Sequence, residues 1–161
     1  MVDSSLVDTV IGSFSLAWNM VEDALLIIPE EEWNKGDIQY LTPSRLILHI
    51  IETEDFFTME TPVSFPLGYR FNCDWQEASS DNIPVQAQML DYFNETRNQT
   101  RSWITMLGST GLLMKETDYP WTGSTRLGRA LYILSNSRQH LGEINAELRR
   151  RGLPRVKWRT F

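Results

Sequence analysis

The chain has 161 residues, of which 42% are hydrophobic and 22% charged, a size and composition typical of one globular domain with its own core. It holds a single cysteine, Cys73, which excludes an internal disulfide framework, and no uninterrupted apolar run approaches the ~20 residues of a membrane span. We therefore expect one domain over residues 1–161, in a reducing, cytoplasmic compartment and without a membrane partner.

The net charge of −6 is unevenly distributed. Six of the 15 basic residues and no acidic residue lie within residues 149–161, which leaves nine basic against 21 acidic residues elsewhere. A body this acidic repels the phosphates of nucleic acid at long range, so nucleic acid is not an expected partner. The arginines complement the partial negative charge at the end of a predicted helix, although this tail could also bind an anion locally.

Four segments repeat apolar residues every three or four positions, which is the period of an α-helix. The first segment runs from Leu6 to Ile28 and ends before Pro29. The second opens at residues 42–44, where a threonine cap precedes a proline in the first turn, and continues to about Met59. Both segments have the length of ordinary bundle helices.

The other two segments are delimited by proline, glycine and capping residues. The third begins near Pro84 and ends between Gly108 and Gly111, and the fourth begins at Ser124 or Thr125 and stops at Gly152. The connection over about residues 60–83 is rich in proline, glycine and aromatic residues, so we expect it to pack on the helices. The predicted fold is an all-α four-helix bundle with this long crossover between the second and third helices.

Both histidines of the chain lie in predicted helices, His49 in the second and His140 in the fourth. Asn136 precedes His140 by four residues and shares its helix face. Bundle sites are built from inward-facing side chains of facing helices, and imidazoles in such places bind zinc and similar divalent ions. Three protein ligands leave a coordination position open for water or substrate. The candidate metal ligands are therefore His49, Asn136 and His140.

The fourth segment contains the residues N-S-R-Q-H-L-G-E-I from Asn136 to Ile144 and ends in L-R-R-R-G-L-P. Together with His49, this pattern resembles the DinB-like or YfiT-like superfamily of metal-dependent four-helix bundles. In that superfamily a histidine on helix two joins an H-x-x-x-H pair on helix four, followed by G-[QE]-I and L-R-x-x-G. This chain departs from the pattern because Asn136 stands at the first histidine of the pair.

The resemblance implies a homodimer and a divalent metal ion, which would be nickel, zinc or manganese. It also implies, for some members, reactions with low-molecular-weight thiols such as bacillithiol or mycothiol. An amide oxygen suits zinc or nickel less well than imidazole does. Glu52 and Glu143 each follow a histidine by three residues, so either carboxylate could complete the ligand set. Alternatively, one of them orients an imidazole through its second nitrogen, or both are solvated.

Besides a module that contacts an anion or nucleic acid through the basic residues Arg149–Arg159, two interpretations of function stay open, and none of them identifies catalytic residues. In the first, the protein is a metal-dependent hydrolase or thiol-dependent S-transferase with a small-molecule substrate. In the second, it is a metal-free, non-catalytic dimeric bundle that binds a small molecule or acts as a scaffold, and its histidines are hydrogen-bonded core residues. Cys73 lies beside acidic and aromatic residues that do not activate a thiol, so we expect it to be packed or partly exposed and not catalytic. Trp75 and Trp121 are candidate pocket walls.

Overall fold

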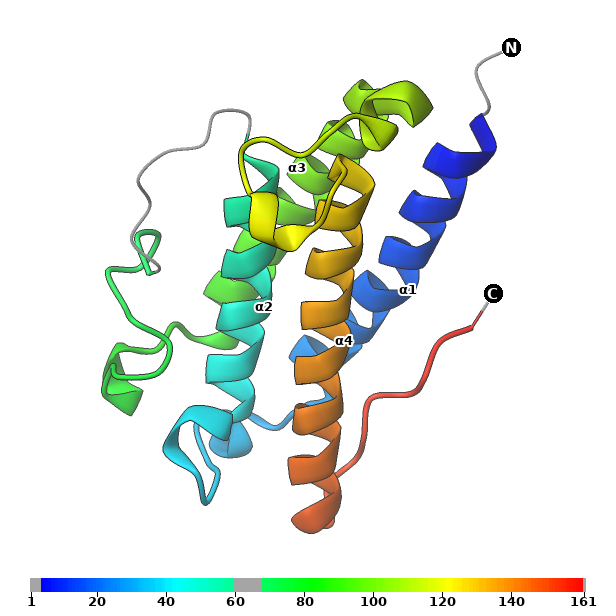
Figure 1. The fold of residues 1–161 in the computed structure, drawn as a ribbon. Helices are drawn as coiled ribbons and strands as arrows, with labels where there is room; N and C mark the ends of the chain where they lie inside the picture. The colour runs from blue at the N-terminus through cyan, green and yellow to red at the C-terminus, as the bar shows by residue number, and fades with distance from the viewer. Residues whose placement is uncertain (1–3, 60–67, 161) are drawn as a thin grey trace.

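The computed structural model describes residues 4–59 and 68–160, and four long helices account for most of them (Figure 1). These helices are α1 (Ser4–Ile27), α2 (Pro43–Thr58), α3 (Gln86–Leu113) and α4 (Arg126–Arg150). Short 3-10 turns lie at Glu30–Glu32, Gln39–Leu41, Ser80–Asn82 and Pro120–Thr122. The described residues contain no β-strand beyond one isolated bridge between Lys115 and Thr125. The predicted all-α class with four helices is therefore confirmed.

The helices pack as a ring in which sequence neighbours are not always spatial neighbours. The main contacts join α1 with α3, α3 with α2, α2 with α4 and α4 with α1. In Figure 1, α1 and α4 run downward and α2 and α3 run upward. Because α2 and α4 lie next to each other, side chains from their middle turns can meet. These turns carry His49 and His140.

The apolar stripes of the four helices face the centre of this ring. Seven of the most deeply buried core side chains, at most 1% exposed, are Phe14, Ile47, Ile51, Met89, Ile104, Ile133 and Ile144. All four long helices contribute to this set, so the periodicity read from the sequence corresponds to one shared core.

Helix α1 is also long and apolar enough to cross a membrane by length and composition, over Leu6–Ile27 with a mean hydropathy of 1.3. The sequence was not expected to contain such a segment, because polar residues interrupt every apolar run in it. The core helix of a bundle meets the same criterion, and 44% of the apolar window is buried against the other helices.

The ends of α4 follow the predicted capping residues. The Thr125 hydroxyl accepts a hydrogen bond from the backbone N–H of Gly128 at 3.2 Å, so Thr125 is the N-cap. At the other end Gly152 has a φ of 67°, and the N–H of Leu153 donates to the carbonyl of Leu148 at 2.9 Å. This is the Schellman arrangement that glycine favours after a helix.

Helix α3 does not end between Gly108 and Gly111 as predicted but continues to Leu113. It is kinked at Gly108, where φ is 61° and ψ is −178°. Residues with a side chain rarely adopt this conformation, so glycine is required there. The sequence therefore located the break in the helix correctly but not the extra turn that follows it.

The predicted crossover over residues 60–83 lies partly outside the described residues. Its described part, residues 68–83, packs on the bundle through the buried side chains of Cys73, Trp75 and Ile83. Arg45 of α2, only 2% exposed, donates to three backbone carbonyls of this segment at 2.5 to 3.1 Å, including that of Trp75. The segment is therefore attached directly to α2, a few residues before His49.

Candidate functional site

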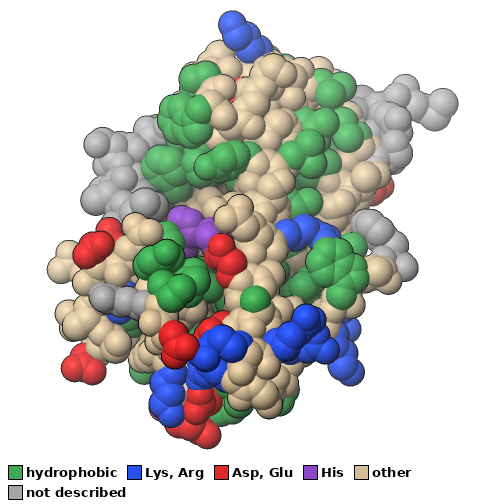
Figure 2. All heavy atoms as spheres, turned by 60° about the horizontal axis from the view of Figure 1, so that its bottom comes forward, with side chains coloured by type: hydrophobic (Ala, Val, Ile, Leu, Met, Phe, Trp, Pro, Cys, Tyr) green, Lys and Arg blue, Asp and Glu red, His purple; other side chains and the backbone are tan. Residues whose placement is uncertain are grey.

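The imidazoles of His49 and His140 meet between α2 and α4. Their ring centres are 4.8 Å apart and the rings are nearly perpendicular, at 80°. His140 is 9% exposed, and imidazole atoms reach the surface in a hollow between hydrophobic and acidic side chains (Figure 2). Two residues 91 positions apart in the sequence thus share one site, because their helices are neighbours in the ring.

Asn136 lies beside this pair, one helical turn before His140. Its side-chain nitrogen Nδ2 is 3.5 Å from Nε2 of His49, which is the outer limit of a hydrogen bond. Its oxygen Oδ1 is buried and has no hydrogen-bond partner among the described residues, and the same holds for Nδ1 of His49. The two predicted histidines and the amide therefore face one another with hydrogen-bonding capacity left unused.

Glu143 contacts one of the two ring nitrogens of His140, Nδ1. Its Oε2 lies 2.6 Å from Nδ1 of the imidazole. This contact keeps the proton on Nδ1, so that the lone pair of Nε2 is available to a ligand. Of the roles that the sequence left open for Glu143, the geometry favours orientation of the imidazole over direct metal binding.

His49 is kept neutral by its surroundings. Burial lowers the pKa of its imidazole to about 4, the neighbouring His140 adds to the decrease, and Asp74 opposes it. Trp75 stacks on the imidazole with ring centres 4.1 Å apart and also approaches His140, at 6.2 Å. A neutral imidazole is the form that binds metal, and Trp75 forms one wall of the site, as the sequence suggested.

Glu52 occupies a different environment from the histidine that precedes it by one turn. It is 0% exposed, and neither carboxyl oxygen meets hydrogen-bond geometry with any described residue. Burial raises the pKa of Glu52 to about 8, the negative charge of Asp74 raises it further, and the backbone amide of Gly68 partly opposes this. The carboxyl is thus largely protonated at neutral pH, which makes it a poor metal ligand in this conformation.

Trp121 does not belong to this site. It is 65% exposed and contacts Tyr119, with ring centres 5.7 Å apart. It precedes α4, whereas His140 lies 14 residues into that helix, a rise of about 20 Å. Trp121 therefore lies by the N-terminal end of α4, away from the histidines, and the prediction that it forms a wall of their pocket is not supported by the geometry.

The residues at the centre of the site fit a weakly held divalent ion. Two imidazoles bound to one ion through ~2.0 Å bonds have ring centres roughly 4.5–5.2 Å apart, a range that includes the separation of His49 and His140. Within residues 4–59 and 68–160, no group of three or more His, Cys, Asp or Glu side chains is placed to hold a metal. Among the described residues, the side-chain amide of Asn136 lies next to His49, at 3.5 Å, so it is the candidate for a third donor.

Sequence reasoning missed the second polar cluster of α2. Asp55 accepts hydrogen bonds from the hydroxyls of Tyr69 and Tyr92, at 2.8 and 2.7 Å, and from the amide of Gln99 at 2.9 Å. Glu54 accepts one from the indole of Trp18 at 2.8 Å. The sequence does contain an indication of this cluster, because three acidic residues lie inside the apolar run that follows His49. Carboxyls buried by such a run need hydrogen-bond donors nearby.

Comparisons of the chain with protein-family models, with curated proteins and with solved structures give no match. The argument about function therefore depends on the residues of the site itself.

Proposed function

We propose that this protein is a DinB-like bundle that binds a divalent metal ion, nickel, zinc or manganese, between His49 and His140. The amide oxygen of Asn136 is the third protein donor. One observation carries the proposal: two imidazoles from neighbouring helices meet beside the side-chain amide of Asn136, whose oxygen is buried and has no hydrogen-bond partner among the described residues. Imidazole nitrogens and amide oxygens offer lone pairs, as a cation site requires.

The unpaired atoms favour this proposal over a simple packed core. A buried polar atom without a partner costs about 1–3 kcal/mol, and native structures hold few of them. Here Nδ1 of His49 and Oδ1 of Asn136 lie in the same small region without partners in the described part of the chain. A bound cation would use the amide oxygen, and rotation of the amide would bring that oxygen toward the site.

The substrate class in this proposal is a small molecule, in a hydrolysis or in a transfer that uses a low-molecular-weight thiol. A bound divalent ion supplies a Lewis acid that lowers the pKa of a coordinated water or thiol. The chain contributes orientation and exclusion of water: Glu143 holds the proton of His140 on Nδ1, and Trp75 covers the face of His49. The homodimer implied by the resemblance belongs to the same proposal.

A metal-free bundle is the second candidate, and two contacts favour it. The Asn136 amide lies within 3.5 Å of His49, and Glu143 already binds His140 at 2.6 Å. In this alternative the pocket binds a small organic molecule or acts as part of a scaffold, and the histidines serve only the core.

Metal content separates the two candidates. The protein is purified from metal-replete medium, analysed for metals, stripped with a chelator and reloaded separately with nickel, zinc and manganese. We expect close to one ion per chain, lost in the His49→Ala, His140→Ala double variant and retained in a Gln139→Ala control, which alters an exposed neighbour. Absence of any stoichiometric metal after reloading would reject the proposal and leave the metal-free bundle.

A further inference from the structure

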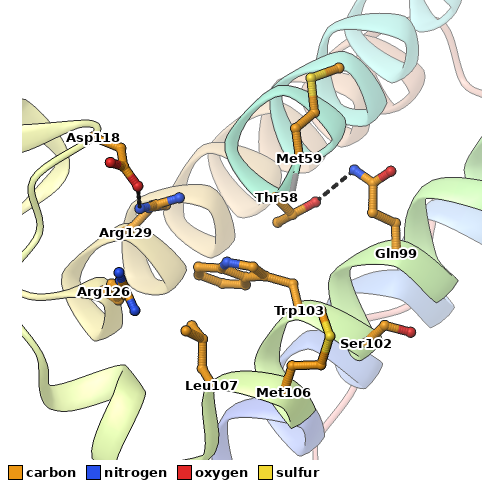
Figure 3. A pocket seen from close by; sticks show the side chains of 10 residues that line it. All are labelled: Thr58, Met59, Gln99, Ser102, Trp103, Met106, Leu107, Asp118, Arg126 and Arg129. Atoms are coloured by element: carbon orange, nitrogen blue, oxygen red, sulfur yellow. Dashed lines mark hydrogen bonds and ion pairs between the residues drawn. The ribbon is translucent and has the colours of Figure 1, made fainter. Parts of the chain in front are cut away.

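A second cavity lies far from the histidines, at the N-terminal end of α4. It has a volume of about 440 Å³ and is bounded by the end of α2, the second half of α3 and the first turn of α4 (Figure 3). Thr58 in its wall is nine residues beyond His49, and Arg126 is 14 residues before His140. At 1.5 Å per residue these separations are about 13 and 21 Å, so this cavity is distinct from the candidate metal site.

Apolar side chains form the floor and one side of the cavity. Trp103, which is 92% buried, lies across the floor between the α4 arginines and the α3 side chains (Figure 3). Met59, Met106 and Leu107 complete the apolar lining, and Met106 is 69% exposed at the rim. The kink at Gly108 immediately follows this wall. Such a surface suits the hydrocarbon part of a small organic ligand.

One of the two arginines in the wall, Arg129, is bound by oxygen atoms of the protein itself. Arg129 donates to both carboxyl oxygens of Glu116 at 2.6 and 2.7 Å, to Asp118 at 3.2 Å and to the backbone carbonyl of Phe57 at 3.2 Å. It is 2% exposed, and its guanidinium also lies 5.3 Å from the ring centre of Trp103. Arg129 therefore holds the wall together, with four of its five N–H groups donating to protein oxygens.

Arg126 differs in every one of these respects. It is half-buried at the edge of the same cavity, and no described residue makes a hydrogen bond or ion pair with its guanidinium. The indole N–H of Trp103 and the hydroxyl of Ser102 also make no hydrogen bond within the described part of the chain. Arg126 opens α4, where the partial positive charge of the helix adds to its own. The cavity thus offers one guanidinium that has no ion-pair partner among the described residues, beside an apolar surface.

Asp118, in the wall of the cavity, disfavours a ligand with two negative charges. Arg129, Glu116 and Asp118 together carry a net charge of −1, and Arg126 brings the sum to zero. A second negative charge on the ligand would face Asp118 without a partner, which favours a carboxylate over a dianionic phosphate.

We propose that this cavity binds a monoanionic organic acid with an apolar body, of roughly ten to twenty non-hydrogen atoms. The carboxylate pairs with the guanidinium of Arg126, and the hydrocarbon part lies against Trp103, Met59 and Met106. This proposal is independent of any metal at His49 and His140.

Calorimetric titration with four probes of equal chain length tests the charge selection: octanoate, octanol, octylamine and octyl phosphate. We expect octanoate to bind at least about tenfold more tightly than the other three, since a charge-assisted pair contributes at that level. Equal affinity for octanoate and octanol, or no binding by octanoate at millimolar concentration, would overturn the proposal.

Variants locate the binding. Arg126→Gln is expected to lower the affinity for octanoate at least about tenfold without lowering stability, because no described residue makes a hydrogen bond or ion pair with its guanidinium. Arg155→Gln removes the same charge from an exposed position and should bind like the wild type. Ser102→Trp, at an exposed wall position, should fill the cavity and abolish binding. If Arg126→Gln and Arg155→Gln bind octanoate equally, the proposal is wrong.

Discussion

Asn136 determines how strongly the site between α2 and α4 can hold a metal. It faces His49 from the position that a third imidazole would occupy in an intact DinB-like pattern. Amide oxygens bind nickel and zinc more weakly than imidazole, and no described carboxylate or thiol joins the two histidines in a group of three. The proposed site is therefore expected to exchange its ion readily.

Replacement of Asn136 with histidine should restore the third imidazole. We expect Asn136→His to raise the affinity for nickel or zinc at least about tenfold, because imidazole replaces the weakest donor. Titration calorimetry on the chelator-treated protein measures the change. Ser135→His adds an imidazole to the exposed face of the same helix and should have no such effect. Equal affinities of the two variants would show that position 136 does not face a metal.

At the scale of elements, α2 connects the site to the rest of the fold through its buried polar side chains. Arg45 binds the described connection before α3, and Asp55 binds Tyr92 and Gln99 on α3. The contact made by Arg45 holds the backbone at Trp75, whose indole stacks on His49. The wall of the site therefore depends on a hydrogen bond made one helical turn away from the histidine.

Arg45→Met should lower the stability of the protein and displace Trp75 from the wall of the site. Three backbone carbonyls lose a charged donor at a buried position, so we expect a loss of about 3 kcal/mol in the free energy of unfolding, measured by denaturant titration. Tryptophan fluorescence should also shift in the folded protein as Trp75 leaves His49. Arg149→Met at an exposed position is the control and should cost under about 0.5 kcal/mol. An unchanged stability would show that the segment is held by apolar packing alone.

At the scale of the whole molecule, the core carries carboxyls that prefer to be protonated. Burial raises the pKa of Glu52 to about 8 and that of Glu54 to about 7, from an ordinary value of 4.5. From pH 4.5 up to the raised pKa of each carboxyl, the folded state keeps a proton that the unfolded state has released. The stability of the fold therefore falls as the pH rises through this range. His49 acts in the opposite sense, because the pKa of its imidazole is lowered to about 4 and folding is favoured as the pH rises toward 6.5.

Above pH 4.5 the two carboxyls change the stability with pH more than the one imidazole does. Above pH 6.5 the imidazole no longer opposes their effect. We therefore expect the thermal midpoint, measured in the presence of a chelator, to be roughly 5 °C lower at pH 8 than at pH 5. Glu52→Gln should make this decline shallower, whereas Glu77→Gln, at an exposed position, should leave it unchanged. A midpoint that rises from pH 5 to pH 8 would contradict the assignment of protonated core carboxyls.

The sequence predicted the local features of the fold well because they depend on residues within one or two helical turns. The threonine cap at Thr125, the stop at Gly152 and the apolar period of each helix are local features of this kind. The turn after Gly108 was missed because a glycine with positive φ can end a helix or only kink it. Packing of the residues that follow makes that choice.

The sequence by itself thus determined four amphipathic helices, a pair of histidines on two of them and an asparagine where a third histidine would stand. Only the tertiary structure decided that α2 and α4 are neighbours, that the imidazoles lie 4.8 Å apart and that Trp75 stacks on one of them. It also decided that the carboxyl of Glu52 is fully buried while Glu143 orients His140. The reason is physical: helix formation depends on neighbours along the chain, whereas burial and proton affinity depend on which distant residues exclude water.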